Sequence, residues 1–271
     1  MAIFILILIL GFAPGVFWLW YFYHRDKIEP EPQHLVIRTF FMGLLMAIPA
    51  AIAEIVLTAI ASLLFARTEK WISPQTIGLF TLVVIAPVVE EYFKYLAART
   101  SVFRHAEFDE PMDGIVYAAA AALGFASIEN VGYLFSAQRE NGWVAFEIVF
   151  VARALLSVPG HVLFSSIWGA ALGRAKFIQD QGATRRLLFS GLLGAMALHG
   201  LFNFFASFSA TENIAFALAG AIGILMLSVI GWVQVHRRMR SALHDSPHSL
   251  ALAFKLSSQT SSDSEEEERI K

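Results

Sequence analysis

Apolar residues in this chain follow one another in blocks of about twenty, separated by short polar stretches, and lack the alternating rhythm of an amphipathic soluble element. A helix needs about 20 apolar residues to cross the hydrocarbon core of a bilayer. The blocks therefore predict an all-α fold, a polytopic transmembrane helical bundle of about seven spans. The expected spans are residues 2–23, 35–65, 76–98, 111–137, 144–177, 186–208 and 214–235.

Prolines predict irregular backbone inside two of these spans. The fifth block is too long for one upright crossing and is interrupted at Pro159 and Gly160, so we expect a broken or re-entrant segment there. Its outer half-helix would carry Arg153 and its main span His161. In the third block, Pro87 has no N–H to donate, which predicts a kink or a loosened turn.

The distribution of positive charge predicts the orientation of the spans, because lysine and arginine are enriched on the cytoplasmic side. Under the seven-span assignment, only Arg67, Lys70 and Arg139 fall on one side, and the loops of the other side are rich in lysine and arginine. The N-terminus is therefore expected outside and the C-terminus in the cytoplasm. We divide the chain into a membrane domain, residues 1–236, and a polar cytosolic tail, residues 237–271, whose composition predicts disorder.

Composition limits the possible functions. Of the 271 residues, 57% are apolar and 15% are charged, and the spans and short loops leave no room for a soluble catalytic domain. Any chemistry must take place in or at the lipid bilayer. The absence of cysteine excludes disulfides, thiolate nucleophiles and cysteine metal sites. The net charge of −2 gives no indication of a nucleic-acid partner.

The third predicted span carries two adjacent carboxylates, Glu90 and Glu91, in its middle. An ionised carboxylate inside a bilayer costs several kcal/mol unless it has a partner, so such residues indicate a functional site. Lys94 lies one helical turn after Glu90 and is expected to keep it ionised, while Glu91 faces elsewhere.

Other embedded polar residues fall at a similar depth when each span is measured at about 1.5 Å per residue. They are Glu129 with Asn130 on the fourth span, His161 on the fifth, and His199 on the sixth. His199 also shares a helix face with Asn203, four residues later. Acidic and imidazole side chains from four helices therefore predict one shared polar pocket.

These residue types suit three kinds of chemistry. Two histidines and two or three carboxylates suit a divalent metal, above all zinc, with one glutamate left as general base. They equally suit a metal-free site in which a glutamate activates water and His or Asn stabilises an oxyanion. Embedded Glu and His are also typical of proton-coupled transporters or permeases, although no internal repeat is evident. A non-catalytic membrane chaperone or scaffold is the remaining alternative.

Three further embedded polar residues are assigned no chemistry. They are Arg153, expected at the outer interface or paired with Glu147 or Glu129, and Glu54 and Asp113, both expected to be structural or interfacial, with Asp113 close enough to the cytoplasmic end to pair with Lys94 or Arg99.

Three motifs then occur in order on successive apolar helices. They are Glu90-Glu91-x-x-Lys94, Phe125-x-x-x-Glu129 and His199-x-x-x-Asn203, with Arg153 and His161 between the second and the third. Over roughly residues 82–204 this pattern resembles the PrsW family of bacterial intramembrane proteases, which is related to the type II CAAX prenyl endopeptidases. The prenyl endopeptidases have a histidine where this chain has Glu129.

The resemblance implies hydrolysis of a peptide bond of a membrane protein or peptide, within or beside a bacterial plasma membrane. For this family it implies site-one cleavage of a membrane-bound anti-sigma factor. Glu90 or Glu91 would be the general base that acts on water. The expected catalytic residues are Glu90, Glu91, Glu129, His199 and Asn203, and the candidate ligands of a zinc ion are Glu91, Glu129, His161 and His199.

Overall fold

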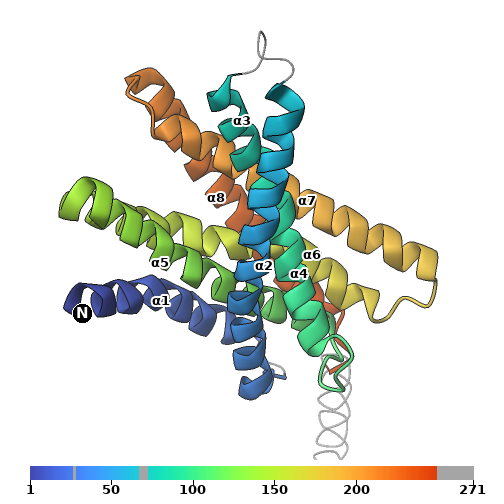
Figure 1. The fold of residues 1–271 in the computed structure, drawn as a ribbon. Coiled ribbons are helices and arrows are strands. Elements are labelled where there is room, and N and C mark those ends of the chain that lie inside the picture. The colour runs from blue at the N-terminus through green and yellow to red at the C-terminus, as the bar shows by residue number, and fades with distance from the viewer. Residues whose placement is uncertain (27–28, 67–72, 249–271) are drawn as a thin grey trace, which may run out of the picture.

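The computed structural model describes residues 1–26, 29–66 and 73–248, and within them all regular structure is helical (Figure 1). The predicted all-α class is confirmed. The α-helices are α1 (Ala2–Tyr23), α2 (Gln33–Ala66), α3 (Pro74–Phe80), α4 (Ala86–Val102), α5 (Pro111–Ala152), α6 (Val158–Ala175), α7 (Gln181–Ser209) and α8 (Ile214–His244). Two π-helical segments, η1 (Thr81–Ile85) and η2 (Arg153–Ser157), join α3 to α4 and α5 to α6.

Six segments of the described chain are long and apolar enough to cross a membrane. The longest, Pro111–Ala175, has 65 residues and doubles back at Gly142, whose φ of 78° lies in the left-handed region that favours glycine. Its two arms run antiparallel, since Gly114 near one end packs against the backbone of Gly169 and Gly173 near the other. With this hairpin crossing twice, the bundle agrees with the prediction of about seven spans.

The irregular turns predicted near the two prolines are π-helical. In η1 the wide turn closes with the N–H of Ala86 bonded to the carbonyl of Thr81, and in η2 with the N–H of Val158 bonded to that of Arg153. Each of these donors directly precedes a proline, Pro87 or Pro159. Because a proline has no N–H to donate to a carbonyl of the preceding turn, that turn widens. The predicted break in the fifth segment therefore takes the form of a five-residue π-helix, η2.

Neighbouring helices bind the backbone carbonyls of both wide turns. The side-chain Nδ2 of Asn203 on α7 donates to the carbonyl of Leu82 at 3.0 Å, and the indole of Trp18 on α1 donates to that of Ala154 at 2.9 Å. A buried carbonyl without such a donor would be costly. These bonds fix η1 against α7 and η2 against α1.

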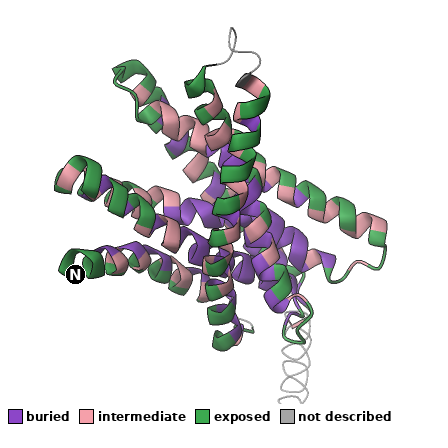
Figure 2. Cartoon of the chain, in the orientation of Figure 1, coloured by how far each residue is buried: buried purple, intermediate pink, exposed green. Residues whose placement is uncertain are grey.

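Helix α5 forms the centre of the bundle, with α1, α2 and α6 packed around it. Its alanines at residues 118–122 are completely buried, which allows close helix contact. Figure 2 shows buried residues concentrated where these helices meet, and exposed residues along the outer arms. Many exposed side chains are large and apolar, as expected of a surface that faces lipid.

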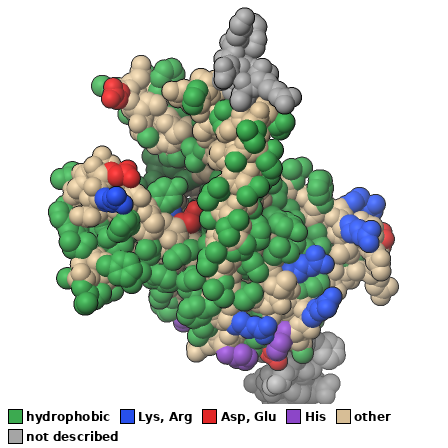
Figure 3. Space-filling model, in the orientation of Figure 1, with side chains coloured by type: hydrophobic (Ala, Val, Ile, Leu, Met, Phe, Trp, Pro, Cys, Tyr) green, Lys and Arg blue, Asp and Glu red, His purple; other side chains and the backbone are tan. Residues whose placement is uncertain are grey.

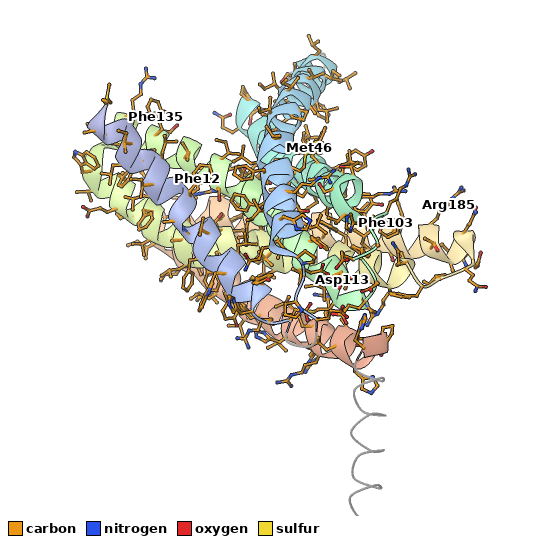
Figure 4. All side chains as sticks on the ribbon, turned by 90° about the horizontal axis from the view of Figure 1, so that it is seen from below. Phe12, Met46, Phe103, Asp113, Phe135 and Arg185 are labelled. Atoms are coloured by element: carbon orange, nitrogen blue, oxygen red, sulfur yellow. The ribbon has the colours of Figure 1, made fainter. Side chains whose placement is uncertain are left out.

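One end of the bundle, which we name the basic end, carries the connections 103–110 and 176–180. Figure 3 shows lysine and arginine side chains gathered there. Figure 4, seen from below, places Phe103, Asp113 and Arg185 toward this end and Phe135 at the other. Helix α8 continues to His244, whereas most of the predicted cytosolic tail, residues 249–271, lies outside the described residues.

Asp113 lies at the basic end and caps α5. Its Oδ2 accepts hydrogen bonds from the backbone N–H of Asp109 at 2.7 Å and of Glu110 at 2.9 Å. This is a structural role, as expected from the sequence, in which the carboxylate binds the start of α5 and not Lys94 or Arg99, the partners that its position allowed. Burial also raises the pKa of the nearby Glu31, which accepts a hydrogen bond from the hydroxyl of Tyr117.

Contact between α2 and α5 depends on Gly124, where an added Cβ would overlap the carbonyl of Phe40. We expect Gly124→Ala to lower the free energy of unfolding by about 1–3 kcal/mol, because the two backbones must separate. The control is Gly132→Ala on the same helix, where a Cβ would meet open space. Thermal unfolding in detergent micelles measures both variants. An equal effect of the two would contradict the packing argument.

Candidate active site

The embedded polar residues predicted to share a pocket lie together in the middle of the bundle. His161 on α6 and His199 on α7 have ring centroids 5.2 Å apart. The carboxylates of α4 and α5 lie within 4 Å of these rings. The assembled residues are Glu90, Glu91 and Lys94 from α4, Glu129 from α5, His161 from α6 and His199 from α7.

A cavity of about 310 Å³ opens from this cluster toward α2 and η2. Figure 3 shows a hollow beside α2 with acidic atoms at its bottom. Glu90, Glu129 and both histidines line the cavity on one side. Glu54 lines it from α2, and Arg153 from η2. Both were assigned no chemistry from the sequence.

Lys94 is the completely buried cation at the centre of the cluster. Its Nζ lies 2.9 Å from Oε2 of Glu90, 3.0 Å from Oε1 of Glu91 and 2.8 Å from Nδ1 of His161. Residues three and four positions earlier on a helix are both within reach of one lysine. Lys94 therefore binds both glutamates, which corrects the expectation from the spacing that it pairs with Glu90 alone. It also lies 4.7 Å from the ring centroid of Phe125, which explains that motif residue as a cation–π partner.

Glu91 is fully buried and both of its oxygens are occupied. Oε2 accepts hydrogen bonds from Ser165 Oγ at 2.7 Å and from Trp168 Nε1 at 2.9 Å. Oε1 accepts from Lys94 and lies 3.1 Å from Nδ1 of His199. Because this ionised carboxylate can only accept hydrogen bonds, the ring proton of His199 lies on Nδ1. The other ring nitrogen, Nε2, then carries a lone pair that faces Glu90.

His161 connects Lys94 to Glu129. Because the lysine ammonium can only donate, Nδ1 of the ring accepts from it and the ring proton lies on Nε2. That Nε2 lies 3.2 Å from Oε2 of Glu129. The side chain of Glu129 is 22% exposed, so its carboxylate stays accessible from the cavity.

Glu90, His161 and His199 each offer one donor atom, all within 4.8 Å of one another. Oε2 of Glu90 is 3.9 Å from Nδ1 of His161 and 3.9 Å from Nε2 of His199. Two ligands of a tetrahedral zinc ion at about 2.0–2.1 Å would be about 3.4 Å apart, so the donors fit such an ion after a small inward movement in which His161 gives up either its hydrogen bond with Lys94 at Nδ1 or its contact with Glu129 at Nε2. Two imidazoles and one carboxylate are also a donor set that zinc accepts.

This geometry differs from the predicted ligand set of Glu91, Glu129, His161 and His199 in one respect. Glu90, and not Glu91, has an oxygen close to both histidines and open to the cavity. Asn203 lines the cavity, but its amide is bonded to the carbonyl of Leu82. Ser165 and Trp168 were missed by sequence reasoning, although their spacing from His161 places both on the same face of α6.

Removing the central cation should destabilise the protein strongly. We expect Lys94→Met to cost about 3–5 kcal/mol of unfolding free energy, because it leaves two buried carboxylates without their charge partner. The double variant Lys94→Met/Glu91→Gln should recover part of this loss. Thermal unfolding checks both, with Arg186→Met as control, since Arg186 is an exposed residue in a surface ion pair with Asp180. A Lys94→Met protein as stable as the parent would contradict the charge argument.

The sequence matches, over residues 31–233, the model of a family described as PrsW family intramembrane metalloprotease. The curated protein Protease PrsW of Geobacillus kaustophilus is 37% identical over 193 residues, covering 71% of this chain and 76% of that protein. Protease PrsW of Bacillus subtilis is 36% identical over 197 residues, covering 72% and 79%. No solved structure matches. The matched region contains the whole cluster around Lys94, and the chain belongs to the PrsW family of intramembrane metalloproteases, which makes it a membrane-embedded peptidase.

Proposed function

We propose that this peptidase hydrolyses a peptide bond of a membrane protein at the cavity, with a water molecule activated by Glu129. Glu90, His161 and His199 would hold a divalent cation, zinc by the chemistry of its donors. The observation that carries the proposal is the meeting of these three donors at the wall of a cavity, with a further accessible carboxylate 3.2 Å from His161.

Each residue of the cluster takes a separate role. When bound, zinc lowers the pKa of water and polarises carbonyl groups. Glu91 orients His199 through Nδ1, as carboxylates behind metal-binding histidines commonly do. Lys94 forms ion pairs with both glutamates of its own helix and offsets one of their two charges. Glu129 is the general base, because its carboxylate faces the cavity.

Assigning the base to Glu129 modifies the sequence prediction that Glu90 or Glu91 plays this role. Glu91 has no oxygen open to the cavity, and Glu90 lies where a ligand is needed. In the reaction, the water oxygen bonds to the carbonyl carbon, one water proton passes to Glu129, and the carbonyl π electrons move to the oxygen. Glu129 then returns the proton to the leaving nitrogen as the C–N bond breaks.

The substrate that the PrsW resemblance implies is a membrane-bound anti-sigma factor, cut at its first site. A cavity deep among apolar helices supports a substrate that is itself embedded in the membrane. We also propose that the basic end of the bundle faces the cytoplasm, as the excess of lysine and arginine favours. The N-terminus would then lie outside, together with the turn at Gly142.

Two isosteric variants distinguish the proposed metal ligand, Glu90, from the proposed general base, Glu129. We expect Glu90→Gln to lose bound zinc and cleavage together, because an amide is a poor ligand. Glu129→Gln should keep its zinc but cut about 10²–10⁴ times more slowly, because no base accepts the proton of water. Glu147→Gln removes an exposed carboxylate of α5 and serves as the control.

The measurement combines metal analysis of each purified protein with cleavage assays in proteoliposomes. The substrates are fluorophore–quencher model peptides with one transmembrane segment. Chelation should stop cleavage and added zinc should restore it. Full cleavage by Glu129→Gln would reject the assignment of the base, and full zinc content in Glu90→Gln would reject the ligand set.

A further inference from the structure

Arg153 is a cation of the cavity wall to which the proposed chemistry gives no role. It is the first residue of η2, and its side chain is only 12% exposed. A guanidinium at this depth of a membrane protein is costly unless it is paired or functional. Its pairing is incomplete in the described structure, as Nη2 is buried without a hydrogen-bond partner and lies 3.7 Å from Oε2 of Glu129.

The guanidinium is nevertheless held firmly from two sides. Its Nε donates to Oδ1 of Asn130 at 2.9 Å, and its Cζ lies 3.9 Å from the ring centroid of Tyr133. Asn130 is itself fixed, because it is completely buried and its Nδ2 donates to the carbonyl of Gly11 on α1 at 3.0 Å. Asn130 thus uses both ends of its amide, and α1 determines where Arg153 points.

A fixed cation whose Nη2 group has no hydrogen-bond partner, beside a reaction site, can bind an oxygen atom of the substrate. The cavity wall also carries Glu90 and Glu129 beside Arg153. A peptide carbonyl is neutral when it enters and acquires negative charge only as water attacks it. A single preorganised guanidinium suits that change of charge.

We propose that Arg153 is a catalytic residue that donates a hydrogen bond from its Nη groups to the scissile carbonyl oxygen as that oxygen becomes negative. Asn130 is the positioning residue that aims the guanidinium. The inference rests on the proposed function, since it requires a peptide carbonyl next to Glu129. It adds an electrostatic role outside the histidine and glutamate cluster.

The test compares Arg153→Ala, Arg153→Lys and Asn130→Ala with the parent in proteoliposomes, using the fluorophore–quencher peptides with one transmembrane segment. We expect Arg153→Ala to lower kcat about 10²–10³-fold, as for loss of one oxyanion donor. KM should change less than about threefold, because the contact strengthens only in the transition state. Arg153→Lys and Asn130→Ala should lose less of kcat, again with KM nearly unchanged.

Two further readouts separate this role from a structural one. A phosphinic peptide, whose charged oxygen imitates the tetrahedral intermediate, should lose affinity for Arg153→Ala by about the same factor as kcat/KM. Added guanidinium ions should restore part of the activity of Arg153→Ala. Zinc content and unfolding temperature should equal those of the parent. Arg139→Ala, an exposed cation of the same hairpin, is the control.

An unchanged kcat in Arg153→Ala would overturn the inference, and so would a change confined to KM. A loss of kcat that follows a loss of zinc and is not restored by guanidinium would also overturn it. If the parent cleaves none of the peptides with zinc bound, the proposed function fails. If the parent and Arg153→Ala cleave equally well, only this inference fails.

Discussion

The buried ammonium group of Lys94 is the interaction on which the site depends. The ammonium is completely buried, so its charge must be met by nearby carboxylates. Glu90 and Glu91 supply them from the same helix, and His161 adds an acceptor from α6. Through Glu91 the network also reaches His199 on α7. One lysine therefore connects three helices, and each histidine ring is oriented by a contact with a charged group of α4.

The two π-helical segments, η1 and η2, also shape the site through the backbone. Each π-helical segment ends just before a proline, and each proline precedes a site residue by two or three positions, Pro87 before Glu90 and Pro159 before His161. Proline widens the turn and so changes the direction in which the following side chains point. The carbonyls of these turns are bonded to Asn203 and Trp18, which lie on other helices. The irregular backbone is thus held at the site by tertiary contacts.

Much of this could be predicted from the sequence, because the cost of burying polar groups in lipid leaves a strong pattern. The spans, the common depth of Glu90, Glu129 and the two histidines, and the irregular turn at Pro87 all follow from it. The sequence could not predict which of the two glutamates, Glu90 or Glu91, has an oxygen open to the cavity. This depends on Ser165 and Trp168 filling the acceptor positions of Glu91, and side-chain directions on a second helix are not encoded in spacing alone.

The proposed reaction moves negative charge within the site and does not change its total. The groups in contact around the histidines are Glu90, Glu91 and Glu129 against Lys94 and Arg153, which leaves an excess of one negative charge when all are ionised. The divalent cation proposed above would change this to an excess of one positive charge. Transfer of the water proton to Glu129 leaves that total unchanged and moves negative charge from the Glu129 carboxylate to the carbonyl oxygen of the substrate. In a low-dielectric interior, catalysis then depends on fixed positive groups that lie close to that oxygen, and Arg153 is a fixed positive group on the cavity wall.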